Sequence, residues 1–302
     1  MTKTTNIRFG HRDMVYPSKD MGELQDSNDL LGDMDALHAR MTQDGFLFLR
    51  GLLDRETVLK ARQTVLTYMD EKNALVPGHP IMEGVMPADG RGVPMMGKDG
   101  VSYHADVLAV LESPTLFQFF ADFFTESAST FKYKWLRAVG NEGYTGAHCD
   151  TVYMGLGSQR LHTVWIPFGD TPVEHGTLTM CMGSNRLDSF RKIRDTYGRM
   201  DVDRDRIDGW FSRDPMEIVE QFGGQWQTTN FKAGDVMIFG MHTMHASTTN
   251  LTNRFRLSCD VRYQPANDAV DKRWGGDKMT GHTAHGIEPL TSMEEARAMW
   301  EV

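Results

Sequence analysis

A series of short strand-like segments after Ser127 constrains the fold of this chain more than any other feature. These segments alternate apolar with polar residues or form short apolar runs, and most are bounded by Gly, Pro, Asn or Asp. The segments are FKYKWLRAVG, RLHTVWIPFGD, GTLTMCMGS, QWQTTNF, GDVMIFGMHTMHAS and RFRLSCDVRYQP. They are too evenly spaced for βαβ units. We therefore expect a closed or double-sheet barrel of the jelly-roll type.

The first half of the chain predicts helices that pack outside this barrel. Apolar residues recur at helical spacing between Asp33 and Asp44, where Gly45 ends the pattern. Asp54 is a suitable N-cap for a second helix, and Ser113-Pro114 opens another. FLFLRG (46–51) indicates a buried strand, and residues 293–300 a terminal helix. Helices followed by strands indicate an α+β, mainly β architecture. Because the sequence shows no linker, we expect one domain over residues 1–302.

Three segments lack this patterning. Residues 1–30 are polar and are expected to form a loosely attached arm. Residues 77–100 are rich in Gly and Pro and indicate a long loop. Residues 185–225 form a charged, helix-prone insertion, which is either a lid or a solvated helical face.

Charge and cysteine content exclude several classes of protein. Lys and Arg number 32 against 41 Asp and Glu, a net charge of −9, which argues against binding to nucleic acid or to an anionic membrane. No uncharged apolar run approaches the roughly 18 residues of a membrane span. Cys149, Cys181 and Cys259 cannot all pair, so we expect a protein of the reducing cytoplasm. With nucleic acid and membranes disfavoured by the net charge, we expect a small-molecule substrate. The sequence does not indicate an oligomeric state. A local basic patch of Lys134, Arg137 and Arg160 could bind a small acid.

Two separate histidine clusters supply candidate metal ligands. In GAHCDT, His148 and Asp150 would leave the same face of a strand. His242 and His245 lie three residues apart and would face opposite sides of another strand, so at most one of them joins this pair. Two histidines and one carboxylate form the facial triad of non-haem Fe(II) oxygenases. A three-ligand zinc site is the competing assignment.

An arginine after the second cluster favours the oxygenase. Arg256 follows His245 on the next predicted strand, and Ser258 shares its face. A guanidinium group binds a carboxylate in a bidentate manner, and the hydroxyl adds a hydrogen bond. This pair would suit an α-keto dicarboxylate that chelates the metal at one end and meets Arg256 at the other.

These residues together resemble the phytanoyl-CoA dioxygenase family of Fe(II)/2-oxoglutarate oxygenases. The resemblance rests on His148-x-Asp150, His245-x-Ser247-x-x-Asn250, Arg256-x-Ser258 and Arg262-Tyr263, and it extends through TVWIPFGD (163–170) and GTLTMCMGSN (176–185). Asn185 stands where the family commonly has histidine.

The resemblance implies a double-stranded β-helix (jelly-roll, cupin-like) core. It implies that His148, Asp150 and His245 are the catalytic iron ligands, and that Arg256, Ser258 and Trp165 contact 2-oxoglutarate. The implied reaction consumes O2 and 2-oxoglutarate, releases succinate and CO2, and oxidises a C–H bond of the substrate. A carboxylate at Asp150 favours hydroxylation over halogenation, since halogenases of this superfamily carry a small residue there.

A metal-binding cupin-like barrel, either a lyase or a sensor without 2-oxoglutarate chemistry, is the alternative. Other histidines are expected to have structural roles or to be exposed: His104, His162, His175 and His242. His162 and Trp165 should face opposite sides of their strand. His282 and His285 lie in a Gly-rich region and could reach a mouth of the barrel, while Arg262 is expected to form an ion pair within the sheet.

Overall fold

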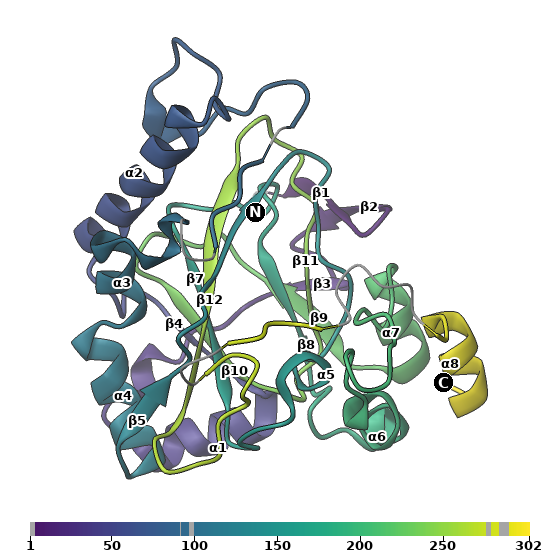
Figure 1. The fold of residues 1–302 in the computed structure, drawn as a ribbon. Helices are drawn as coiled ribbons and strands as arrows, with labels where there is room; N and C mark the ends of the chain where they lie inside the picture. Colours follow the sequence, from purple (N-terminus) through teal and green to yellow (C-terminus); the bar gives the residue numbers. More distant parts are fainter. Residues whose placement is uncertain (1–3, 91, 97–99, 276–278, 284–289) are drawn as a thin grey trace.

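Two mainly antiparallel sheets face each other across a shared interior in the computed structural model (Figure 1). The structure describes residues 4–90, 92–96, 100–275, 279–283 and 290–302. Side chains from both sheets, including Phe48, Met180 and Met237, pack together in one buried cluster between them. This arrangement is the predicted jelly-roll core, and the helices outside it make the fold α+β.

The larger sheet has the strand order β4-β10-β7-β12-β5, and β6 also pairs with β12. Its strands are β4 (Phe46–Leu49), β5 (Ala128–Thr130), β6 (Trp135–Val139), β7 (His162–Pro167), β10 (Val236–Gly240) and β12 (Arg256–Pro265). The smaller sheet has the order β11-β8-β9-β3. Its strands are β3 (Met21–Glu23), β8 (Leu178–Met182), β9 (Gln225–Thr228) and β11 (His245–Ser247), and β3 is parallel to β9.

Strand β12 shows how the sequence pattern builds the site. All its residues are buried, yet polar and apolar side chains alternate along it. Leu257, Cys259, Val261 and Tyr263 belong to the core cluster under the helices. Because successive side chains point to opposite faces of a strand, the polar residues between them face the barrel interior. The interior of this barrel therefore carries a row of polar and charged groups.

A helical layer covers the outer face of the larger sheet (Figure 1). It consists of α1 (Met34–Asp44), α2 (Arg55–Glu71), α3 (Ala105–Leu111) and α4 (Pro114–Phe124). The side chains of Asp54 and Ser113 accept hydrogen bonds from the first turns of α2 and α4, where helix starts were predicted, and Asp33 caps α1 in the same way. Gly45 ends α1 with φ of 85°, a left-handed conformation that favours glycine. Helix α3 was not predicted.

The stretch Ala105–Phe124 is long and apolar enough to cross a membrane by length and composition alone. It consists of the two helices α3 and α4, interrupted at Glu112 and Ser113. Its aromatic face packs on the sheet, where the ring of Phe120 stacks on that of Tyr263 at 4.5 Å.

The N-terminal segment differs from the predicted loose arm. Residues Thr5–Phe9 (β1) and Arg12–Tyr16 (β2) form a hairpin, and β3 joins the smaller sheet. Ile7 and Phe9 are buried, and Phe9 meets the ring of Trp226 edge-on. The reason is a short period-two pattern, in which only two apolar residues of β1 face inward, too few to stand out from a polar sequence.

Residues 185–225 pack against the smaller sheet together with the C-terminal helix α8 (Met293–Trp300) (Figure 1). They include α6 (Arg191–Asp195) and α7 (Pro215–Phe222), and they bury Phe190, Ile193, Tyr197, Phe211 and Ile218. The insertion is thus packed on one side and is not merely a solvated helical face. Single turns of 3-10 helix lie at Asn28–Leu30, Ile81–Glu83, Val101–Tyr103, Asp188–Phe190 and Tyr197–Arg199.

Candidate metal centre

Two histidines that are far apart in the sequence are joined by backbone hydrogen bonds. The amide N–H of His148 donates to the carbonyl of His245 at 3.0 Å, and that of His245 donates to the carbonyl of His148 at 2.9 Å. Such a reciprocal pair places two residues directly opposite each other, with both side chains on the same face. The ring centroids are consequently 4.1 Å apart.

Asp150 approaches the two imidazoles through a turn rather than along a strand. We expected His148 and Asp150 to share a strand face, but Asp150 has helical dihedral angles and begins the short helix α5 (Thr151–Met154). Its Oδ1 atom lies 3.8 Å from Nε2 of His148 and 3.7 Å from Nε2 of His245. Three buried ligand atoms therefore lie within 4.8 Å of one another.

Both histidines are held in the tautomer that a metal requires. Nδ1 of His148 lies 2.8 Å from the carbonyl oxygen of Gly146, and Nδ1 of His245 lies 3.0 Å from that of Thr243. An Nδ1–H that donates to a carbonyl leaves the lone pair on Nε2, the atom that faces Asp150. Burial lowers the pKa of His148 to about 3, so this imidazole is neutral at physiological pH.

The two oxygens of Asp150 have different partners. Oδ2 accepts hydrogen bonds from the hydroxyl of Thr163 and, at 3.1 Å, from the guanidinium group of Arg262. Oδ1 faces the histidines. Burial alone would raise the pKa of Asp150, but the charge of Arg262, the two neighbouring imidazoles and the hydrogen bond from Thr163 together outweigh it and hold this pKa below its ordinary value. The carboxylate is thus ionised and oriented, with one oxygen available to a metal.

Arg256 and Trp165 line the same small space as the three ligands, which we call the metal pocket. Arg256 is 3% exposed, and its guanidinium group donates to the hydroxyl of Ser258 at 2.6 Å and lies over the ring of Trp165. Its Nε–H has no acceptor in the described part of the chain. Burial lowers the pKa of Arg256 to about 10, so the group remains charged at neutral pH. Arg256 forms no ion pair with any of the described residues, and because a buried cation without an anionic partner is costly, this group suits a bound carboxylate.

A larger space, which we call the aromatic cavity, adjoins the metal pocket. Its volume is about 840 Å³. The two share Arg137, Thr145, His148, Asp150 and Arg262 in their walls. The remaining walls come mainly from aromatic side chains of several distant segments. A ligand in the aromatic cavity would therefore reach the metal ligands directly.

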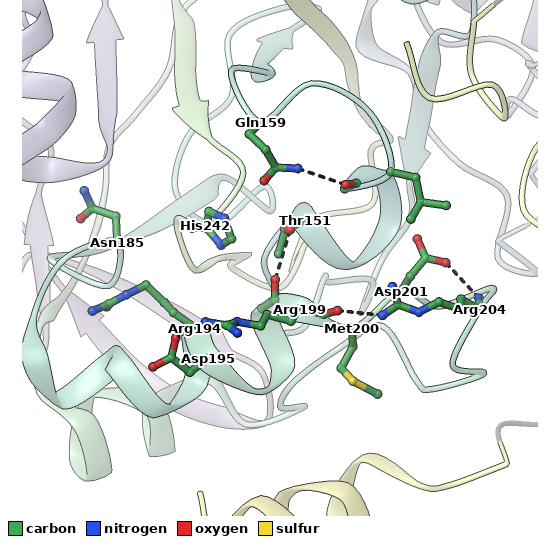
Figure 2. A pocket seen from close by; sticks show the side chains of 13 residues that line it. Thr151, Gln159, Asn185, Arg194, Asp195, Arg199, Met200, Asp201, Arg204 and His242 are labelled. Carbon is green, nitrogen blue, oxygen red and sulfur yellow. Dashed lines mark hydrogen bonds and ion pairs between the residues drawn. The ribbon is translucent and has the colours of Figure 1, made fainter. Parts of the chain in front are cut away.

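His242 lies outside this site. It occupies the turn between β10 and β11 and does not lie on a strand, so the prediction that it faces the opposite side of one strand from His245 is wrong. Its side chain nevertheless lies away from that of His245. His242 lines a different hollow of about 430 Å³, shown in Figure 2. Arg194 in the same hollow donates to the backbone carbonyls of Ser184 and Leu187, and Asn185 donates to that of Thr42.

The other histidines are distributed as follows. His162 packs among the phenylalanines of α4, on the sheet face opposite Trp165, as expected. Nε2 of His175 lies 3.0 Å from the carbonyl oxygen of Arg254, and His104 caps α3. His282 lines the aromatic cavity and pairs with Asp203 at 2.9 Å. His285 lies outside the described residues.

The basic patch proposed from the sequence does not form. Lys134 is buried and pairs with Glu112 at 2.9 Å, while Arg160 pairs at the surface with Glu126 and Asp268. Only Arg137 faces the aromatic cavity.

Sequence reasoning missed Thr163 and did not foresee which residue Arg262 would pair with. Strand alternation contained both signals, because Thr163 lies two residues from Trp165 and Arg262 four residues from Ser258.

The chain is similar to known proteins over most of its length. The family model described as phytanoyl-CoA dioxygenase (PhyH) matches residues 41–258. Among solved structures, the epimerase SnoN in complex with Fe3+, alpha ketoglutarate and nogalamycin RO is 18% identical with a TM-score of 0.53, over 86% of this chain and 96% of that one. The carbocyclase SnoK is 15% identical with a TM-score of 0.55, over 88% and 96% of the two chains.

EctD from S. alaskensis with 2-oxoglutarate and 5-hydroxyectoine is 14% identical with a TM-score of 0.56, over 92% of this chain and 89% of that one. At these identities the likeness establishes the jelly-roll fold.

Proposed function

The chain belongs to the phytanoyl-CoA dioxygenase family, and we propose that it is a non-haem Fe(II)- and 2-oxoglutarate-dependent oxygenase. In this proposal it hydroxylates a small organic molecule with consumption of O2 and release of succinate and CO2. His148, Asp150 and His245 bind the iron. Arg256 holds the distal carboxylate of 2-oxoglutarate, Ser258 orients Arg256, and Trp165 lines the cosubstrate site.

One observation carries this proposal. Three convergent metal-type ligand atoms share a buried pocket with a guanidinium group whose Nε–H has no partner in the described part of the chain. A zinc hydrolase needs the ligands alone. The additional buried cation is explained by a cosubstrate that chelates the metal and carries a second carboxylate.

The residues fit such a metal, and each has a distinct role in holding or orienting the groups around it. Bound iron supplies the activation of O2, which protein side chains cannot provide. Thr163 and Arg262 hold one oxygen of Asp150 so that the other remains directed at the histidines. Gly146 and Thr243 fix the imidazole tautomers. The three ligand side chains are themselves buried, which limits the contact of bulk water with the metal that they would hold.

The test begins with binding under anaerobic conditions. Fe(II) and 2-oxoglutarate added together should produce a weak visible absorption band, and succinate should form once O2 is admitted. Replacing Arg256 with Met should weaken 2-oxoglutarate binding about 10- to 100-fold, because a charge-assisted pair contributes about 1.5–3 kcal/mol. Fe(II) binding should persist.

Arg62 offers a matched control. It is also a buried arginine whose pKa burial lowers to about 10, but it donates to the backbone carbonyls of Met82 and Phe168 away from the metal pocket. Arg62→Met should leave 2-oxoglutarate affinity unchanged. If the protein bound Fe(II) but neither bound 2-oxoglutarate nor converted it to succinate, it would instead be a metal-binding barrel of another kind.

Hydroxylation is the specific outcome that we propose, and the gain of one oxygen atom by the product tests it. Structural neighbours named as an epimerase and a carbocyclase have the same fold, so the mass and connectivity of the product decide. We further propose that residues 185–225 cover one side of the aromatic cavity, because Trp210 lines that cavity. A cytoplasmic location is consistent with three unpaired, buried cysteines.

A further inference from the structure

We propose that the aromatic cavity binds a flat, aromatic small molecule that carries one anionic oxygen group, and that Arg137 holds this group. The inference deepens the proposed function and rests on it, because the cavity opens onto the candidate iron ligands. It concerns the primary substrate and assigns Arg137 as the residue that selects it.

The walls of the cavity favour a planar ligand. The space of about 840 Å³ is near the upper end of the roughly 300–1,000 Å³ typical of small-molecule sites, large enough for several fused rings. Its aromatic walls come from Tyr103, Tyr133, Trp135, Tyr153, Trp210 and Trp274. Ring systems gain additional stabilisation from offset or edge-on contacts with such side chains.

Three of these rings support one another. The ring centroid of Trp135 lies 4.7 Å from that of Tyr133 and 4.9 Å from that of Trp274. The centroids of Tyr133 and Trp274 are 5.3 Å apart. The guanidinium group of Arg262 lies over the ring of Trp135, 4.2 Å from its centroid, and also holds that ring in place. The wall is therefore formed before a ligand arrives, which favours a rigid flat partner over a flexible chain.

Arg137 is the cation available to a ligand. Its Nε–H donates to Asp260 at 2.8 Å, and its side chain is 46% exposed whereas Asp260 is 11% exposed. Its terminal nitrogens have no hydrogen-bond acceptor among the described residues, and the side chain lines both the cavity and the metal pocket. Arg262 also lines the cavity, and its Nε and Nη1 have no hydrogen-bond partner among the described residues, but its side chain is only 3% exposed and it pairs with Asp150. Arg256 is buried in the metal pocket, so Arg137 is the most accessible of the three guanidinium groups.

The charge of the site also favours an anion. Three guanidinium groups, from Arg137, Arg256 and Arg262, face two carboxylates, from Asp150 and Asp260. The charges of a divalent metal and of doubly charged 2-oxoglutarate cancel. One positive charge then remains unmatched beside the cavity, and it disfavours a cationic substrate even though aromatic walls alone would accept one.

The experiment uses the full chain with Fe(II) and 2-oxoglutarate under anaerobic conditions, so that the metal pocket is filled. The probes are anthracene-2-carboxylate, its neutral carboxamide and the cationic 2-(aminomethyl)anthracene, followed by fluorescence anisotropy. Dodecanoate, added as a competitor, represents an acid with a flexible chain. We expect the anthracene acid to bind about tenfold or more tighter than each of the other three.

Variants assign the preference to Arg137. Arg137→Gln should reduce affinity for the anthracene acid to that of the amide and leave 2-oxoglutarate affinity unchanged, while Arg137→Lys should retain part of the preference. Arg55→Gln is the matched control, because Arg55 is 47% exposed and pairs with one carboxylate, Asp170, outside the cavity. It should bind all probes as the unmodified protein does.

Several results would overturn the inference. Equal binding of acid and amide, tightest binding of the amine, or displacement of the anthracene acid by equal amounts of dodecanoate would each contradict the substrate class. A loss of 2-oxoglutarate affinity in Arg137→Gln, with the probe unaffected, would assign Arg137 to the cosubstrate. Absence of the Fe(II)/2-oxoglutarate band would instead contradict the proposed function, and it is measured independently of the probes.

Discussion

The hydroxyl of Thr163 provides the sharpest test of how the metal site is oriented. Thr163 is buried on β7, directly opposite Arg262 of β12, and both groups donate to Oδ2 of Asp150. Thr163→Val replaces this hydroxyl by a methyl group of nearly the same shape. The substitution therefore removes one hydrogen bond to the carboxylate and leaves the strand packing in place.

The expected effect follows from the charge of the acceptor. A hydrogen bond to an ionised group contributes about 1.5–3 kcal/mol. Arg262 still holds the same oxygen at 3.1 Å, so the lower end of this range applies. At about 1.4 kcal/mol for each factor of ten, Fe(II) should bind about tenfold more weakly, in line with the usual cost of losing a hydrogen bond to a metal ligand.

Anaerobic titration with Fe(II), followed by calorimetry, measures this affinity. Thr179→Val is the control, because Thr179 is also fully buried on a strand but its hydroxyl has no partner in the described part of the chain. This control should bind Fe(II) normally and be at least as stable as the unmodified protein. Unchanged Fe(II) affinity in Thr163→Val, or an equal loss in both variants, would refute the reasoning.

Three further predictions concern stability. Arg262→Met leaves the buried carboxylate of Asp150 without its ion-pair partner and should lower the free energy of unfolding of the metal-free protein by about 3–5 kcal/mol, measured by urea denaturation. Fe(II) at a hundred times its dissociation constant should raise this free energy by about 2.7 kcal/mol, and Asp150→Asn should abolish the gain. Burial lowers the pKa of His162 to about 4 from an ordinary value of 6.5, so its contribution to stability is complete above about pH 6.5 and is lost as the pH falls towards 4. His162→Phe should therefore flatten the decline in stability over this range, whereas an unchanged slope would show that other groups cause it.

Much of the fold could be predicted because its signals are local. Period-two alternation identified the strands of the jelly roll, and side chains such as Asp54 and Ser113 marked helix starts through hydrogen bonds to the first turn. The strand β1 was missed because it is short and only Ile7 and Phe9 turn inward. A pattern of two residues is too brief to separate from a polar segment.

The convergence of the three candidate metal ligands could be predicted because strand direction restricts where side chains point, although the local structure differs from the prediction. His148 forms only an isolated bridge, and Asp150 begins a helix. The same rule applied along β12 from Ser258 would have placed Asp260 and Arg262 on the site face. The sequence analysis followed this face of β12 only as far as Arg256 and Ser258.

The aromatic cavity could not be predicted in this way. Tyr103, Tyr153, Trp210 and Trp274 come from four segments that no local pattern relates to one another. Their meeting depends on how the loops and the insertion pack over the barrel mouth. For that reason the reaction class could be inferred from the sequence, whereas the substrate class that we propose depends on the structure.

The pairing of His148 with His245 makes the metal site a consequence of strand register. Their reciprocal backbone hydrogen bonds fix which residues lie opposite, and β11 is in turn held on β8 by the pairing of His245 with Met180. A shift of β11 by one residue would turn the imidazole of His245 to the other face of its strand and away from that of His148. Strand register, together with the helix start that places Asp150, therefore brings the three candidate ligand side chains together.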